Sequence, residues 1–205
     1  MRKIDLDEYD IDIQDESFGI DESQMTKVAP NKSEATNTLY EWIHSIVVAI
    51  VIVVLLLTFV FRLINIDGPS MQNTLMHNDK VIITNFFYEP KVGDIVVIPA
   101  GKYYDKPIIK RIIALEGQEV YINYQTYEVY VDGILLEEDY ISTNTVSKDG
   151  KTEYSITVGE GQAFILGDNR EVSFDSRYFD CINVDDIIGK AQFVILPFSR
   201  FGYLY

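Results

Sequence analysis

Residues that build disulfides and metal centres are scarce in this chain. Cys181 is the only cysteine, and His44 and His77 are the only histidines, among 205 residues. A single cysteine excludes an intrachain disulfide, and one cysteine with two histidines gives no zinc-ligand spacing. We therefore predict a protein without a metal or another cofactor.

Basic residues are also few, with 17 Lys and Arg against 32 Asp and Glu and a formal net charge of −15. A nucleic-acid partner needs a basic face for its phosphates, so this composition argues against one. Residues 1–42 contain 11 acidic and 4 basic side chains and few large apolar ones. Such a segment buries little apolar surface, and we expect a disordered tail.

Residues 43–61 form a long apolar run without a charged residue. As a helix it would span about 28 Å, close to the ~30 Å hydrocarbon thickness of a bilayer. Trp42 before the run and Arg62 after it are flanking residues typical of a membrane interface. We predict a transmembrane anchor that holds the chain in a lipid bilayer.

A cleaved signal peptide is the competing interpretation of this run. Signal peptides begin near residue 1 and end in a cleavage site with small residues. Here 42 residues precede the run and no Ala-x-Ala pattern follows it, which favours an uncleaved anchor. The positive-inside rule barely decides orientation, since Lys27 and Lys32 precede the run and Arg62 follows it.

Residues 62–205 contain eight short apolar or alternating runs separated by Gly, Asp, Asn and Pro, a pattern typical of strands. The runs are 80–85, 94–99, 108–115, 119–124, 127–131, 154–157, 162–166 and 191–196. Asp132-Gly133 is a tight-turn sequence at the end of one run. We predict a mainly β fold, an antiparallel sandwich or barrel-like domain preceded by a single transmembrane helix.

Two stretches contain candidate reactive side chains. Ser70 follows Gly68-Pro69, which breaks regular structure and places the serine on a constrained loop. There the serine is either the N-cap of a short helix or a nucleophile. Lys110 lies in an apolar run. It is either a solvated charge on an edge strand or a desolvated amine. A lysine base near neutral pH needs its pKa lowered from about 10.4 to about 7, which burial among apolar neighbours can produce.

A third polar stretch, residues 167–178, forms either a solvated loop with weak ion pairs or a brace around a site. In the second case Ser173 is available to bind a neutral amine. The side chains concerned are Asp168, Asn169, Arg170, Ser173, Asp175, Ser176 and Arg177. A thiol nucleophile would be Cys181 with His77 as partner, but acidic neighbours would raise the pKa of Cys181, and packing is the simpler role.

Taken together, these stretches resemble bacterial type I signal peptidases, in the compact form typical of Gram-positive bacteria. The resemblance covers the anchor and most of residues 62–205. It rests on four motifs in the family's order: Ser70-Met71 with Thr74-Leu75, Gly93-Asp94-Ile95-Val96-Val97, Lys110-Arg111 with Gly117, and Gly167-Asp168-Asn169-Arg170 with Ser173 and Asp175-Ser176-Arg177.

The resemblance implies a role for each site residue. Ser70 would be the nucleophile, with its backbone N–H in the oxyanion hole, and Lys110 the general base. Ser173 would orient the Lys110 amine, and Met71 would line the binding cleft. The remaining residues would support the site: Arg111, Asp168, Asn169, Arg170, Asp175, Ser176 and Arg177.

The resemblance also implies a substrate and a setting. Exported preproteins with small residues at positions −1 and −3 would be cleaved outside the cell membrane, with the N-terminal tail in the cytoplasm. The alternatives are a membrane-tethered β-rich binding module without catalysis and a sortase-like transpeptidase that uses Cys181.

Three positions depart from the family pattern. Asn73 stands where the family usually has Pro, and Glu116-Gly117-Gln118 stands where it has Pro-Gly-Asp. Gly68 occupies the place of a serine that donates to the oxyanion in some members. The second oxyanion donor is therefore left open.

Overall fold

The computed structural model describes residues 32–204, and its N-terminal helix α1 comprises Lys32–Phe59. Residues 32–42, which we assigned to the tail, are therefore helical, and residues 1–31 lie outside the described residues. Phe61, which we assigned to the anchor, instead opens strand β1 (Phe61–Asn65). Among the described residues, one helical stretch, Asn37–Leu56, is long and apolar enough to cross a membrane.

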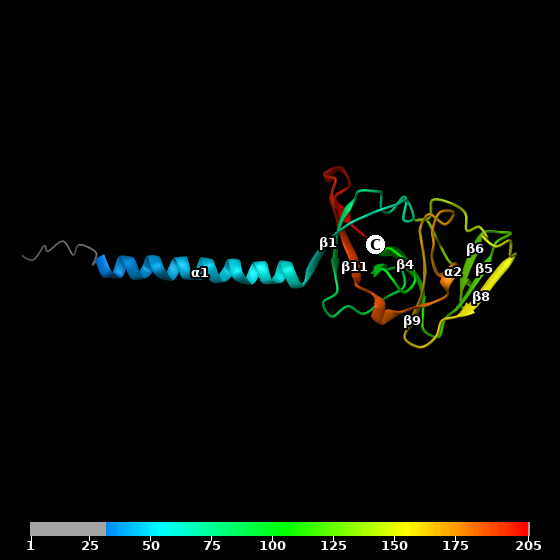
Figure 1. Ribbon diagram of the computed structural model, residues 1–205, viewed down its shortest axis with the longest axis horizontal. Helices are drawn as coiled ribbons and strands as arrows, with labels where there is room; N and C mark the ends of the chain where they lie inside the picture. Colours follow the sequence, from blue (N-terminus) through cyan, green and yellow to red (C-terminus); the bar gives the residue numbers. More distant parts are fainter. Residues whose placement is uncertain (1–31, 205) are drawn as a thin grey trace, which may run out of the picture. The chain divides into compact units, whose positions relative to one another are not determined.

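The larger of two antiparallel sheets has the order β1-β2-β11-β3-β4-β9-β10, with β12 paired to β11. Figure 1 labels four of its strands, β1, β11, β4 and β9. After β1, its strands are β2 (Lys80–Thr84), β3 (Ile95–Ile98), β4 (Ile108–Leu115), β9 (Gln162–Leu166), β10 (Ile182–Asn183), β11 (Gly189–Leu196) and β12 (Gly202–Tyr203). Strand β4 lies between β3 and β9, and residues 108–114 are buried. Lys110 therefore lies on an inner strand, not on an edge.

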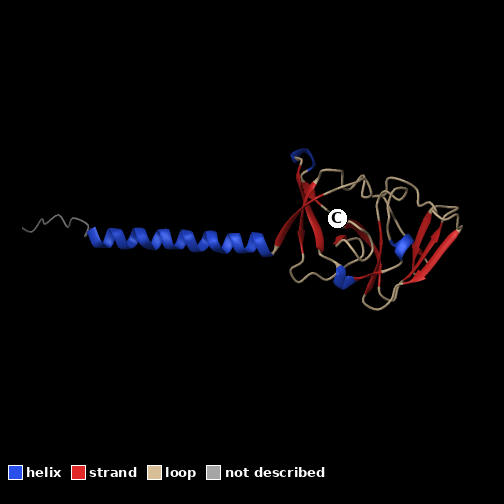
Figure 2. Ribbon diagram, viewed as in Figure 1, coloured by secondary structure: helices blue, strands red, loops and turns tan. Residues whose placement is uncertain are grey.

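The smaller sheet has the order β7-β6-β5-β8. Its strands are β5 (Glu119–Asn123), β6 (Glu128–Val131), β7 (Ile134–Leu135) and β8 (Glu153–Thr157). Asp132 and Gly133 join β6 to β7 with φ values of 52° and 75°, the two positive angles that a type I′ hairpin turn requires. Short helical turns occupy Ser176–Phe179 (α2), Val184–Asp186 and Phe198–Arg200 (Figure 2).

The core under the larger sheet also anchors the loop that contains Ser70. Alternate residues of β2, Val81 and Ile83, are buried there together with Met71 and Leu75 from that loop. Burying a large apolar side chain contributes roughly 1.5–3 kcal/mol, so the two buried loop residues hold the loop against the sheet.

Each of the eight predicted runs overlaps a strand, and the prediction of a mainly β fold is confirmed. The sequence did not predict β1, β7, β10 or β12. Three of these have only two residues, and β1 continues the apolar composition of the helix before it. Such strands are defined by their pairing partners, which a local pattern does not contain.

Candidate active site

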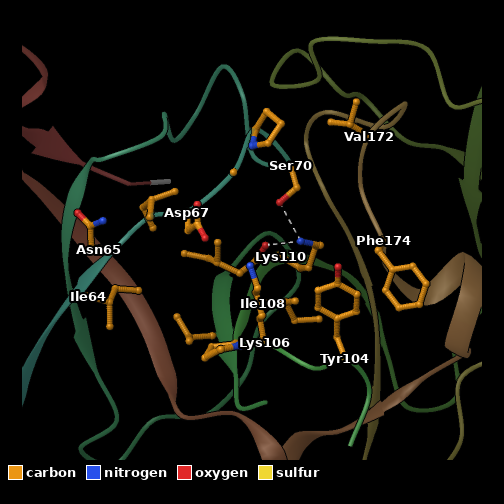
Figure 3. Close-up of a pocket in the computed structure, with 16 residues that line it drawn as sticks. Ile64, Asn65, Asp67, Ser70, Tyr104, Lys106, Ile108, Lys110, Val172 and Phe174 are labelled. Carbon is orange, nitrogen blue, oxygen red and sulfur yellow. Dashed lines mark hydrogen bonds between the residues drawn. The ribbon is translucent and has the colours of Figure 1, made fainter. Parts of the chain in front are cut away.

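A cavity of about 700 Å³ opens beside Ser70 and Lys110 (Figure 3). Ile64 of β1 lies on one side of it, and Tyr104 and Phe174 lie on the other (Figure 3). Six aliphatic side chains contribute to the lining: Ile64, Ile66, Val97, Ile108, Ile109 and Val172. The cavity therefore combines a largely apolar wall with the Ser70 hydroxyl and the Lys110 amine, and Tyr104 and Lys106 add a second hydroxyl and a second amine.

The Lys110 amine and the Ser70 hydroxyl are in contact. Lys110 Nζ donates to Ser70 Oγ at 2.9 Å and to the Ile109 carbonyl oxygen at 2.8 Å (Figure 3). Gly68, two residues before Ser70, has a φ of 99°, a conformation that side chains rarely adopt. The sharp turn at Gly68-Pro69 lets the chain present Ser70 to β4.

Burial governs the charge of Lys110, which is 2% exposed. Desolvation lowers the pKa of its amine to about 8, because the charged form loses its water. The carboxylates of Asp175 and Asp168 act in the opposite direction, and the Arg177 guanidinium lowers the pKa further. At pH 7, roughly a tenth of the molecules then hold a neutral Lys110 amine.

Asp168 joins β4 to the loop that contains Ser70. Its buried carboxylate accepts from Arg111 Nε at 3.0 Å, from Arg111 Nη2 at 2.8 Å and from the Thr74 hydroxyl at 2.5 Å. The next residue, Asn169, donates its N–H to the Ser70 carbonyl oxygen at 3.0 Å. These bonds fix the backbone of Ser70 relative to the strand that contains the amine.

The second half of the 167–178 stretch is also internally bonded. Arg177 donates to Asp175 through Nε at 2.8 Å and through Nη2 at 2.9 Å. Asp175 also accepts the Gly167 N–H at 3.1 Å, and the Ser176 hydroxyl accepts the Ile165 N–H at 2.9 Å. The stretch is for the most part a buried brace and not a solvated loop, and its exposed residues are Glu171, Val172 and Tyr178.

Two expected contacts are absent. The buried Ser173 hydroxyl has no hydrogen-bond partner among the described residues, so the predicted bond to Lys110 is not formed, and Lys110 donates to the Ile109 carbonyl instead. Met71 is 1% exposed and packs in the core. The prediction that Met71 lines the cleft is wrong, because the loop turns this side chain toward the core while Ser70 borders the cavity.

The partners of two arginines were not predicted. The fully buried Arg170 guanidinium pairs with Glu138 and donates to the Thr145 hydroxyl at 2.6 Å. The Tyr140 ring centre lies 4.1 Å from Arg111 Cζ. Glu138, Tyr140 and Thr145 lie between β7 and β8, where the sequence contains no motif. The only signal in the sequence for these partners was the general rule that a buried arginine needs a group that balances its charge.

The Cys181 and His77 alternative is not supported by the fold. Cys181 packs against a hydrophobic core cluster, and burial, with Asp180, raises the pKa of its thiol. His77 is exposed and accepts the Gly68 N–H at 3.2 Å. Cys181 precedes β10 and His77 precedes β2, several strands apart in the sheet. No Cys–His contact occurs within residues 32–204.

Comparisons with known proteins agree with the motifs. A family model described as signal peptidase, peptidase S26, matches residues 39–196. Signal peptidase IB of Staphylococcus aureus is 35% identical over 182 residues, which cover 80% of this chain and 93% of the relative. Signal peptidase I of Bacillus licheniformis is 32% identical over 174 residues, 80% of this chain and 92% of the relative.

A crystal structure of a signal peptidase I from Enterococcus faecalis is 31% identical and covers 50% of this chain and 97% of that chain, with a TM-score of 0.42. The sequence matches identify the chain as a peptidase. It belongs to the signal peptidase family, peptidase S26, as the four motifs predicted.

Proposed function

We propose that this chain cleaves signal peptides from exported preproteins, with Ser70 as nucleophile and Lys110 as general base. The observation that carries the proposal is the 2.9 Å contact between Lys110 Nζ and Ser70 Oγ. Burial of the amine, which lowers its pKa to about 8, supports its action as a base near neutral pH.

In the first step, Ser70 Oγ attacks the carbonyl carbon before the scissile bond while the neutral Lys110 amine takes its proton. The carbon–nitrogen bond then breaks, and Lys110 returns the proton to the leaving amine. Water hydrolyses the resulting ester at Ser70, with Lys110 again accepting a proton. The reaction therefore needs the amine uncharged at the start of each half-reaction.

The oxyanion needs donors close to Ser70. The Ser70 N–H has no acceptor within the described part of the chain, which supports its use as one donor. Gly68 has no hydroxyl, and its N–H already donates to His77 Nδ1 at 3.2 Å. Gly68 therefore supplies no second donor in this arrangement.

The cavity supports a substrate with small apolar residues at positions −1 and −3. Its aliphatic wall of Ile and Val side chains favours Ala over polar residues. Strand β1 ends the sheet order, and Ile64–Ile66 border the cavity, so an extended peptide can add along this edge by backbone pairing.

The anchor supports a single-pass membrane protein with its β domain outside the cell membrane and its N-terminus in the cytoplasm. Signal peptides are cleaved after the preprotein has crossed the bilayer, so the reactive groups must lie on that side. Ser70 follows Phe59, the last residue of α1, by 11 residues in the chain. A shared membrane raises the effective concentration of the substrate.

The test is cleavage of a preprotein with an Ala-x-Ala site by the purified full chain in detergent. We expect Ser70→Ala and Lys110→Ala each to lower kcat by a factor of about 10³ or more. Cys181→Ala and Lys102→Ala, a lysine in the connection before β4 and outside the cavity lining, serve as controls and retain activity. Cleavage by Lys110→Ala would disprove the proposed base, and loss in Cys181→Ala would favour a thiol mechanism.

A further inference from the structure

The connection between β7 and β8 runs alongside the loop that holds Ser70 in place. We name Glu138–Val146 the strap and residues 167–171 the brace loop. The Ser142 N–H donates to the Asp168 carbonyl oxygen at 3.0 Å, and Thr143 pairs with Asn169 in an isolated parallel bridge. The strap thus contacts the brace loop on two consecutive residues.

Hydrogen bonds connect the strap to the Ser70 backbone in two steps. The Thr143 hydroxyl donates to Asn169 Oδ1 at 3.0 Å and accepts the Glu171 N–H at 3.0 Å. Asn169 in turn donates its N–H to the Ser70 carbonyl oxygen at 3.0 Å. A movement of Thr143 therefore reaches Ser70 through one intervening residue.

Charged side chains make a second connection, on the Lys110 side. Arg111, the neighbour of Lys110 on β4, holds Asp168 through two hydrogen bonds at 3.0 and 2.8 Å. The Tyr140 ring covers the Arg111 guanidinium at 4.1 Å, and its hydroxyl donates to Glu138 at 3.2 Å. A cation held over an aromatic face loses freedom to rotate, so the ring fixes the plane that Arg111 presents to Asp168.

We propose that the strap is a positioning element for the Ser70 and Lys110 reaction, and that the Tyr140 ring is its central group. This inference rests on the proposed function. The ring keeps the Arg111 guanidinium on the Asp168 carboxylate. The positive charge of Arg111 then balances the negative charge of Asp168 beside the amine, and Asn169 stays bonded to Ser70. Tyr140 is a positioning residue, because its contacts within the described part of the chain are to Arg111 and Glu138 and not to the reacting atoms.

The test compares Tyr140→Leu, which removes the ring, with Tyr140→Phe, which keeps it, in the full chain in detergent. For the folded fraction of Tyr140→Leu we expect kcat to fall about tenfold with KM within about twofold of wild type. We expect Tyr140→Phe to remain within about twofold of wild type in both constants.

The pH profile separates positioning from simple destabilisation. The charges that act on Lys110 are Asp175 and Asp168, which raise its pKa, and Arg177, which lowers it. If Arg111 leaves Asp168, the freed carboxylate raises the pKa of Lys110. The rate of Tyr140→Leu should then rise at higher pH than that of wild type, with a larger loss at pH 7 than at pH 9.

Tyr130→Leu is the matched control. The Tyr130 hydroxyl also donates to a glutamate, Glu128, at 2.9 Å, and its ring contacts Tyr121 within the smaller sheet, outside the strap. We expect wild-type kcat and pH dependence for this variant. If kcat falls as far in Tyr130→Leu as in Tyr140→Leu, the loss reflects general destabilisation and not positioning by the strap, which would overturn the inference.

A folded Tyr140→Leu with wild-type kcat and pH profile would also overturn it. If near-ultraviolet circular dichroism shows that Tyr140→Leu does not fold, Thr143→Val and Thr143→Ser replace it. We expect kcat to fall in Thr143→Val and to be restored in Thr143→Ser, and equal activity in the two refutes the strap. Activity in Ser70→Ala would instead refute the proposed function, whatever the strap variants do.

Discussion

Gly167 packs so closely against Ser173 that a side chain on Gly167 would overlap the Ser173 hydroxyl. The same Cβ would lie 2.5 Å from the Ser70 carbonyl oxygen. At Gly167 the backbone of the brace loop is therefore in direct contact with both the Ser173 hydroxyl and the backbone of Ser70, the proposed nucleophile. Glycine is required here for space and not for a special backbone angle.

Gly167→Ala should inactivate the enzyme without unfolding it. The added methyl group must displace Ser173 and Ser70, and a misplacement of about 1 Å at a reacting group can lower the rate about 100-fold. The measurement is kcat on an Ala-x-Ala preprotein, with the fold checked by circular dichroism. Gly202→Ala is the control, since its Cβ meets no atom closer than 3.9 Å. Wild-type kcat in Gly167→Ala would contradict the packing argument.

The pH dependence of kcat should report the Lys110 amine. Burial lowers the pKa of Lys110 to about 8, and in the proposed mechanism only the neutral amine accepts the Ser70 proton. Activity is therefore low at pH 6, where the amine is charged, and rises through an apparent pKa near 8. A rate that is flat from about pH 6 to pH 9, or that rises only near the pKa of a free lysine, about 10.4, would contradict a desolvated base.

Lys110→Met should make the folded chain more stable at neutral pH while abolishing cleavage. The folded pKa lies below the unfolded one, so the penalty for burying the charge is fully present below about pH 8 and disappears above about 10.5. At pH 7 we expect a gain on the order of 3 kcal/mol in the free energy of unfolding, shrinking by pH 10.

Urea unfolding of the full chain in detergent, at pH 7 and pH 10, measures this gain. Lys80→Met, at an exposed position of β2, is the control and should show no such pH-dependent gain. A Lys110→Met variant that is destabilised equally at both pH values would show that the amine contributes to the fold and is not a buried charge under strain.

Ser173→Ala should separate folding from catalysis. Its buried hydroxyl has no partner in the described residues, so its removal should leave the free energy of unfolding unchanged or raise it by about 1 kcal/mol. If Ser173 orients the amine once Ser70 has lost its proton, kcat should fall about tenfold. Ser155→Ala on β8, an exposed serine bonded to Glu119, is the control. Unchanged kcat in Ser173→Ala would remove the orienting role.

The sequence predicted strands where the signal was local. Period-two alternation in Lys80–Thr84 and Glu119–Asn123 puts every second side chain in the core, and Asp132-Gly133 ends a strand by its own backbone preference. It did not predict β1, because a five-residue apolar strand directly after an apolar helix differs from that helix only in its pairing with β2.

Site residues divide in the same way. Ser70, Lys110 and Asp168 were found because each belongs to a short motif. Glu138 and Tyr140 were missed because their partners, Arg170 and Arg111, lie about 30 residues away in the chain, a separation that no local pattern records.

The amino-acid sequence by itself determined a membrane-length apolar helix, a β-rich domain and a serine and a lysine in motifs of one family, since these depend on composition and short spacing. Only the tertiary structure decided that Lys110 is buried on an inner strand at 2.9 Å from Ser70, that Met71 faces the core and that the Ser173 hydroxyl has no partner among residues 32–204. Desolvation depends on groups brought together from distant parts of the chain, so the pKa of the Lys110 amine is lowered only once the sheet has closed around it.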